Sequence, residues 1–214
     1  MIALLTGDII NSRGLKDQDL WISPFKKLLG NWGKTPKNWE ITRGDSFQLE
    51  IKNPEDSLMA ALQIKALLKS LPNPDTNKRS SVVDARMAIG IGVKDYEAER
   101  ISESNGEAFI LSGEKFEQLK LEMVTLAVNS PWEHWNKEVN LYLKLASIQM
   151  DSWSISSGEL MMEILTNPDR KQAEIGQTLD INQNSVSKRY KTAHAEEILE
   201  LEKMYRSKLK QNLQ

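Results

Sequence analysis

The segment Met1–Arg13 constrains the fold more than any other part of the chain. Its first five residues are an apolar run typical of a buried strand, and this run leads directly into Thr6, Gly7 and Asp8. An aspartate at the mouth of a buried strand is costly unless a metal ion, a cation or backbone N–H groups compensate its charge. We therefore expect Asp8 to have such a partner.

A second aspartate, Asp45, lies between two strand-like runs, in the segment Ile41–Phe47. Two aspartates on adjacent strands suit a divalent ion that also binds phosphate oxygens, so we predict that Asp8 and Asp45 bind Mg²⁺. A structural alternative stays open. Asp8 can pair with Arg13 or Arg43, which are otherwise candidates for phosphate binding, and residues 43–45 can form a tight turn.

The composition excludes several kinds of site. The 214 residues contain no cysteine and two histidines, which rules out disulfides, zinc thiolates and a multi-histidine metal site within one chain. The first residues lack the basic segment of a signal peptide, and no apolar run reaches membrane-spanning length. We expect a cytoplasmic protein with no membrane partner. The net charge is −2, although residues 168–214 carry +2.

The hydrophobic pattern of residues 1–129 predicts an α+β domain. The elements follow the order strand, helix, strand, strand, helix, strand, helix, strand, which is typical of a ferredoxin-like or palm domain whose helices pack on a mostly antiparallel sheet. Alternating glycines in the fourth strand indicate a close approach to one face. The expected strands cover residues 2–5, 39–42, 47–51, 85–93 and 123–128, and the expected helices cover about 17–32 and 54–71 and a segment that begins at Ser112.

The rest of the chain is predicted to be helical, with a connector over residues 130–167 and a helix-turn-helix domain over 168–214. In the second part, residues 171–179 and 185–194 read as two helices joined by a turn at 180–184. The spacing of its apolar residues predicts the small core of a helix-turn-helix, formed by Ala173, Ile175, Leu179, Ile181 and Val186.

The second of these helices indicates DNA binding. It has three basic residues and no acid, and its amide and hydroxyl groups suit base edges while its cations suit phosphates. The predicted DNA-binding residues are Asn184, Ser185, Ser187, Lys188, Arg189 and Lys191. A protein-interaction module is the alternative. The last helix carries an apolar stripe that suits either a homodimer, which we predict, or a cover for its own helix-turn-helix: Ile198, Leu201, Tyr205 and Leu209.

Three segments together resemble the palm domain of class III nucleotidyl cyclases and GGDEF-type enzymes: Thr6–Ile10, residues 43–47, and residues 87–92 followed by 105–109. The resemblance implies that Asp8 and Asp45 bind Mg²⁺ and that the amides of Ile9 and Ile10 lie near phosphate.

The two helix positions that hold an asparagine and an arginine in those cyclases are Ile110 and Glu114 here. An apolar residue and an acid cannot stabilise developing negative charge. We therefore expect nucleotide binding without efficient cyclisation.

The order of four motifs along nearly the whole chain resembles the SatD family of bacterial proteins, which are usually described as regulators. These motifs are residues 6–13, the segment 43–48, the strand 88–92 and the helix-turn-helix. This resemblance implies the architecture rather than the chemistry, and we predict a DNA-binding regulator whose palm-like domain binds a nucleotide or another phosphate ligand with Mg²⁺. The alternatives are a divergent Mg²⁺-dependent nucleotidyl cyclase or nucleotidyltransferase, and a protein-interaction adaptor.

Overall fold

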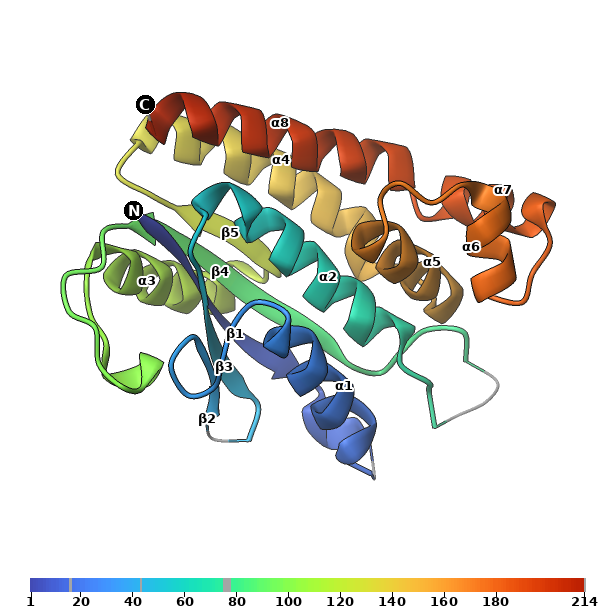
Figure 1. Ribbon diagram of the computed structural model, residues 1–214, viewed down its shortest axis with the longest axis horizontal. Helices are drawn as coiled ribbons and strands as arrows, with labels where there is room; N and C mark the ends of the chain where they lie inside the picture. The colour runs from blue at the N-terminus through green and yellow to red at the C-terminus, as the bar shows by residue number, and fades with distance from the viewer. Residues whose placement is uncertain (16, 43, 75–77, 214) are drawn as a thin grey trace.

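A central five-stranded sheet carries helices on both of its faces (Figure 1). The computed structural model describes residues 1–15, 17–42, 44–74 and 78–213. The strands are β1 (Ile2–Ile10), β2 (Trp39–Thr42), β3 (Ser46–Ile51), β4 (Asp84–Gly92) and β5 (Leu126–Asn129). The helices are α1 (Asp19–Gly30), α2 (Ser57–Ser70), α3 (Glu107–Glu122), α4 (Glu133–Asp151), α5 (Ile155–Thr166), α6 (Gln172–Thr178), α7 (Gln183–Thr192) and α8 (Ala195–Leu213). Short 3-10 helices are η1 (Ser12–Gly14), η2 (Pro54–Asp56) and η3 (Ile101–Glu103).

The sheet confirms the predicted α+β class and the predicted order of elements, and it corrects the strand directions. Its strand order is β2-β3-β1-β4-β5. Three neighbouring pairs are antiparallel, whereas β4 and β5 are parallel, so the sheet is mixed. The connection between β4 and β5 runs through α3, and a helical crossover of this length is what a parallel pair requires.

Successive side chains along each strand point to opposite faces of the sheet, and the two faces belong to different apolar clusters. Ala3, Leu5 and Ile9 of β1 belong to the large core that includes α1 and α2, while Leu4 belongs to a smaller cluster with Ala108 of α3. A strand that is apolar on both faces is expected where helices cover both. This explains why β1 begins as a continuous apolar run.

The glycines of β4 allow α3 to lie directly on the strand. A Cβ on Gly92 would lie 2.7 Å from the backbone nitrogen of Ala108, and a Cβ on Gly90 would collide with backbone atoms of Ala108 and Ser112. The close approach expected from the alternating glycines is therefore an approach by a helix.

Two predicted boundaries around α3 are wrong. The helix begins at Glu107, so Ser112 lies inside it, and its hydroxyl bonds to the Phe109 carbonyl and to the Thr6 hydroxyl. Met123, expected to begin the last strand, follows the helix in the left-handed conformation with φ 54° and is exposed. The sequence pattern misses these boundaries because apolar residues recur only weakly at helical spacing in α3. Only a few of its side chains are buried.

The C-terminal helices pack over α2 and share one core with the sheet. Gly158 of α5 makes the closest approach, since a Cβ there would lie 2.5 Å from the backbone nitrogen of Ser70. The hydroxyl groups of Ser57 and Tyr205 are 2.8 Å apart, which ties α8 to the start of α2. The predicted boundaries after residues 129 and 167 fall at the end of β5 and at the C-cap of α5.

The apolar stripe of α8 is used within its own chain. Ile198, Tyr205 and Leu209 are buried in the large core, and α8 packs against α2, α4 and α7. Leu201, the fourth residue of the stripe, is half-buried and lines a groove between α4 and α8, so most of the stripe is unavailable to a second copy. Of the two uses that the sequence left open, an internal one is observed, and it includes contacts with α2 and α4.

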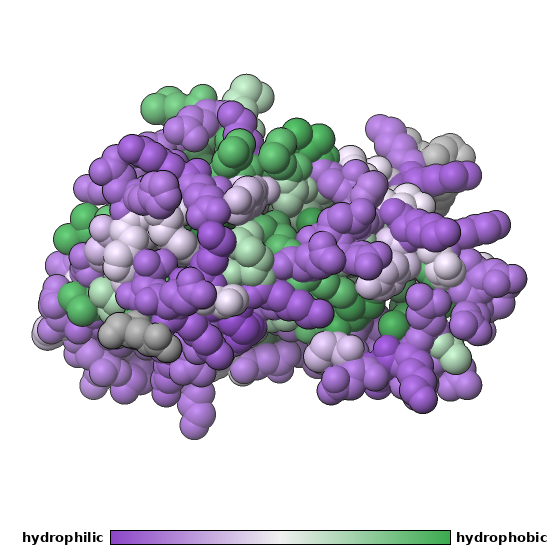
Figure 2. Space-filling view, turned by 90° about the horizontal axis from the view of Figure 1, so that it is seen from above, coloured by the Kyte–Doolittle hydropathy of each residue, from purple (hydrophilic) through white to green (hydrophobic). Residues whose placement is uncertain are grey.

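The outer surface of α4 is apolar. Leu141, Leu145 and Ile148 are 56%, 58% and 71% exposed, and a groove of 610 Å³ runs between α4 and α8. Figure 2, a view onto the side of α8, shows apolar side chains gathered among hydrophilic ones. Among the described residues, no helix combines the length and the apolar character needed to cross a membrane.

Candidate functional site

Asp8 and Asp45 lie together at one end of the sheet. The register of β1 and β3 places Asp8 opposite Ser46, the residue after Asp45. The Ile9 N–H donates a hydrogen bond of 3.0 Å to the Asp45 carbonyl oxygen, which fixes the second aspartate beside the end of β1. Asp8 thus lies on β1, and Asp45 lies in the turn immediately before the adjacent strand β3.

The Asp8 carboxylate is only partly compensated. Its Oδ2 lies 3.6 Å from a guanidinium nitrogen of Arg86, while its Oδ1 is buried and has no hydrogen-bond partner among the described residues. Burial raises the pKa of Asp8, and the neighbouring Asp45 raises it further, against the opposing effects of Arg86 and Lys120. A buried, unpartnered carboxylate oxygen is where a cation or a proton is favoured.

The Asp45 carboxylate is positioned by the turn that follows β1. Ser12, a buried residue of η1, donates its hydroxyl proton to Asp45 Oδ2 at 3.2 Å. The preceding Asn11 adopts a left-handed conformation with φ 57°, which turns the chain back toward Asp45. The Ser12 hydroxyl and the Asp45 carboxylate therefore place further hard oxygen ligands beside Asp8.

The residues present fit a magnesium ion that brings its own phosphate ligand. Magnesium ions are bound through one or two carboxylates plus phosphate oxygens and water, so a third acid is not required. Within the described part of the chain, no group of three or more metal-binding side chains forms. The orphaned Oδ1 of Asp8 and the nearby Asp45 carboxylate supply the two oxygens that such a site needs.

The other predicted phosphate ligands differ in their placement. The Ile9 amide is already bonded to Asp45, and Ile10 lies opposite Asp84 in the ladder with β4. Arg13 is exposed, and Arg43 lies outside the described residues. Among the described residues, the ion-pair partner of Asp8 is Arg86 of β4 rather than Arg13.

The two positions at which the cyclase resemblance places an asparagine and an arginine lie on α3, away from the protein core. Ile110 is 55% exposed and Glu114 is exposed. The positive side chain of α3 that influences Asp8 is instead Lys120, which lies near the end of the helix. The helix thus brings one cation toward the acids, and it presents neither an amide nor a guanidinium at the positions where the resemblance places them.

A second candidate site lies at α6 and α7. Ile175 and Val186 are buried between these helices, and Leu179 and Ile181 are partly buried, as predicted. Ala173, which was expected in the same core, is exposed because it lies on the outer side of the short helix α6. The core also includes α5, which packs against both α6 and α7.

The turn between α6 and α7 is closed by specific residues. A Cβ on Gly176 would lie 2.7 Å from the Ile181 carbonyl oxygen, so the tight approach there requires glycine. The side-chain oxygen of Asn182 accepts a 2.9 Å hydrogen bond from the Ser185 N–H and caps α7. This N-cap marks the true start of the helix, two residues before the predicted one.

The surface of α7 exposes most of the predicted DNA-binding residues. Asn184, Lys188 and Lys191 are exposed, and Ser185 and Ser187 are half-buried. Arg189 differs, because its guanidinium forms a 2.9 Å ion pair with Glu159 of α5. The outward surface of α7 therefore combines amide, hydroxyl and ammonium groups, while one of its three cations is used to hold α5.

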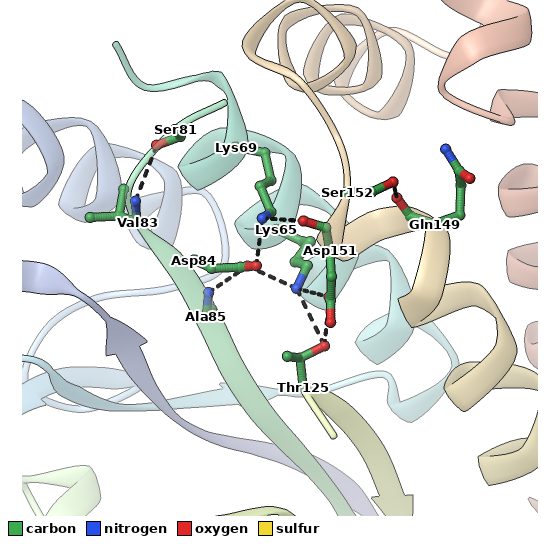
Figure 3. Close-up of polar contacts among 10 residues, drawn as sticks. All are labelled: Lys65, Lys69, Ser81, Val83, Asp84, Ala85, Thr125, Gln149, Asp151 and Ser152. Atoms are coloured by element: carbon green, nitrogen blue, oxygen red, sulfur yellow. Dashed lines mark hydrogen bonds and ion pairs between the residues drawn. The ribbon is translucent and has the colours of Figure 1, made fainter. Parts of the chain in front are cut away.

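A buried charge cluster joins α2, β4 and the end of α4, and the sequence pattern did not predict it (Figure 3). Lys65 is 1% exposed, and its Nζ lies 2.8 Å from Asp84 Oδ1 and 2.5 Å from Asp151 Oδ1. Lys69 pairs with the other oxygen of Asp84 at 2.7 Å and donates to the Asp151 carbonyl oxygen at 2.6 Å. The sequence feature that could have indicated this cluster is Lys65, a charged residue within the apolar stripe of α2.

Comparisons of this chain with protein-family models, with curated proteins and with solved structures find no match. The resemblances to the SatD family and to the cyclase palm domains therefore stay predictions from the motifs.

Proposed function

We propose that this protein is a DNA-binding regulator. In this proposal α7 enters the major groove, Asn184 and the serines near its start contact base edges, and Lys188 and Lys191 contact phosphates. The observation that carries the proposal is the exposed surface of α7, which presents amide and ammonium groups and no acid.

The two acids at the end of the sheet support a sensing role for the other half of the molecule. We propose that Asp8 and Asp45 bind Mg²⁺ together with a nucleotide or another phosphate-bearing ligand. The buried Oδ1 of Asp8, which has no hydrogen-bond partner among the residues that the structure describes, supports this assignment. The ion would compensate the carboxylates and bridge them to phosphate oxygens. Exposed Ile110 and Glu114 supply no transition-state stabilisation, which favours binding over turnover.

A homodimer is part of the proposal, because most helix-turn-helix proteins double their DNA contact by two-fold symmetry. Since the stripe of α8 is internal, we place the contact with the second copy at Leu141, Leu145 and Ile148 of α4. Charge complementarity favours a second copy. Lys144 lies exposed beside these residues, and Glu197 and Glu200 line the α8 side of the same groove.

The DNA-binding proposal is tested by selection of duplexes from a random pool, followed by fluorescence anisotropy at several salt concentrations. We expect enrichment of a two-fold symmetric sequence and an affinity that falls as salt rises. If the wild-type chain retains no duplex at low salt, the regulator proposal is wrong.

Light scattering tests the dimer separately. Leu145→Glu is expected to halve the mass of the particle, whereas the exposed Leu121→Glu is not.

The ligand proposal is tested by thermal shift with nucleotides in the presence and absence of Mg²⁺. A ligand of the folded state raises the melting temperature by mass action. We expect the shift to require Mg²⁺ and to disappear in both Asp8→Ala and Asp45→Ala, whereas Asp95→Ala, an exposed acid on the loop after β4, should retain it. Equal shifts in all four proteins would contradict the assignment.

A further inference from the structure

A basic pocket lies between α7, the first turn of α5 and the segment that leads into β4. Its volume is 530 Å³. Three structural segments that are distant in the sequence contribute to it, and their polar side chains are Arg79, Ser154, Ser156, Ser157, Lys188, Arg189 and Thr192. Three of these seven side chains are cations, and none is an acid.

Two of the three cations have no side-chain partner in the part of the chain that the structure describes. Arg189 is compensated by Glu159 at 2.9 Å. The side chains of Arg79 and Lys188 form no ion pair or hydrogen bond with any residue that the structure describes. A pocket that gathers two uncompensated cations is electrostatically suited to an anion, and the hydroxyl groups of Ser156 and Thr192 add uncharged donors.

The backbone holds Arg79 at the rim of this pocket. The Ile155 N–H donates a 2.8 Å hydrogen bond to the Arg79 carbonyl oxygen, so the segment before β4 is tied to the start of α5. The Ser154 hydroxyl oxygen accepts from the Ser157 N–H at 3.1 Å and completes the cap of the same helix. Because α5 also packs on α7, the guanidinium of Arg79 and the ammonium of Lys188 are presented by connected elements.

We propose that this pocket binds a phosphate group of the DNA backbone, with Arg79 supplying a contact from outside the helix-turn-helix. The inference rests on the proposed function and extends it. A guanidinium offers two parallel N–H donors to phosphate oxygens, and the lysine adds a point charge beside it. A backbone phosphate next to α7 is the anion that this location would meet, because α7 presents Lys188 both to the pocket and to solvent.

The proposal distinguishes Arg79 from an equally charged neighbour that lies outside the pocket. Lys78 precedes Arg79, is exposed, and does not line the pocket. The DNA affinity of Arg79→Ala, Arg79→Lys, Lys188→Ala and Lys78→Ala is measured by fluorescence anisotropy between low and moderate salt, on the full chain. Circular dichroism confirms that each variant is folded.

We expect Arg79→Ala and Lys188→Ala each to weaken binding about tenfold and to reduce the slope of log affinity against log salt by about one unit. Arg79→Lys should keep the slope, because it keeps the charge, and Lys78→Ala should behave as the wild type. If Arg79→Ala is indistinguishable from Lys78→Ala while the wild-type chain binds DNA, the pocket is not a phosphate contact, and the DNA-binding proposal stands without it.

If the wild-type chain retains no DNA, the proposed function fails, and inorganic phosphate then tests the pocket alone. Titration is followed by the amide chemical shifts of Ser156 and Thr192 in the full chain. Saturable shifts that are lost in Arg79→Ala and kept in Lys78→Ala would support a phosphate site with a source other than DNA. No shifts in the wild-type chain would overturn the pocket as a phosphate site.

Discussion

The Nζ of Lys65 lies 2.8 Å from Oδ1 of Asp84, and the lysine is 1% exposed. The second oxygen of Asp84 accepts from Lys69, so one aspartate at the start of β4 pairs with two lysines of α2, and Asp151 is a second partner for Lys65. A buried charge that loses its partner is strongly destabilising, even where the pair as a whole contributes little net stability. The position of α2 on the sheet therefore depends on Asp84.

Replacement of Asp84 should reduce stability more than the loss of an ordinary ion pair. We expect Asp84→Ala to lower the free energy of unfolding by about 3 kcal/mol, because two lysines lose a buried partner. Urea denaturation followed by circular dichroism measures the change. Glu133→Ala removes an exposed ion pair with Lys137 on α4 and should leave the midpoint unchanged. Equal midpoints for both variants would show that the cluster is not coupled to folding.

Asp8 should make the stability of the protein depend on pH in a predictable direction. Its pKa in the folded state is raised above the ordinary value of 3.8, chiefly by burial. The folded state therefore binds this proton more tightly than the unfolded state, and the resulting stabilisation, complete below pH 3.8, is lost as the pH rises through the folded-state pKa. At pH 7 without metal, the charged carboxylate is thus a net cost.

Asp8→Asn should accordingly be more stable than the wild type at pH 7 without metal, and this advantage should shrink as the pH falls toward 3.8 and below. Urea titrations of both proteins at several pH values measure the difference, in which the contributions of other acids cancel. A difference that stays constant with pH would show that burial does not raise the pKa of Asp8.

Two cations of α7 should differ in their effect on DNA binding. Lys191 is exposed, whereas Arg189 is held by Glu159. Lys191→Ala should weaken binding to all duplexes and reduce the salt slope by about one unit, as expected for a phosphate contact. Arg189→Ala should change the slope less and should instead reduce thermal stability. If the two variants give the same slope, the ion pair of Arg189 opens on DNA binding.

Two glycines inside helices should respond oppositely to alanine. A Cβ at Gly158 would lie 2.5 Å from the Ser70 backbone, whereas a Cβ at Gly113 of α3 meets nothing within 4 Å. We expect Gly158→Ala to destabilise the protein by about 1–3 kcal/mol through overpacking. Gly113→Ala should stabilise it by about 0.5–1 kcal/mol through the higher helix propensity of alanine. Thermal denaturation of both variants tests the pair, and stabilisation by Gly158→Ala would contradict the close packing of α2 and α5.

Local patterns predicted the identity of the elements but not all of the pairings between them. The alternation Phe47, Leu49, Ile51 predicted β3, and the apolar run before Asp8 predicted β1, because each pattern reports which side chains are buried. Strand direction leaves no such mark on a sequence. The parallel pairing of β5 follows from the crossover through α3, whose start the pattern misplaced at Ser112.

The candidate sites were predictable to different degrees. The juxtaposition of Asp8 and Asp45 followed from acids at the ends of two predicted strands. The ion pair of Asp8 with Arg86 did not, because it depends on which strand lies beside β1. The pocket at Arg79 was also beyond a sequence-only prediction, since its cations are separated by more than a hundred positions and meet only because α5 returns to the segment before β4.

The bond between Ser57 and Tyr205 has a consequence for the synthesis of the protein. The two residues are 148 positions apart, so at about 5–20 residues per second the ribosome needs roughly 7–30 seconds to deliver the second after the first. During that interval the side of α2 that α8 later covers stays uncovered on a nascent chain. We therefore expect this side of α2 to be accessible to chaperones on the nascent chain until α8 has emerged.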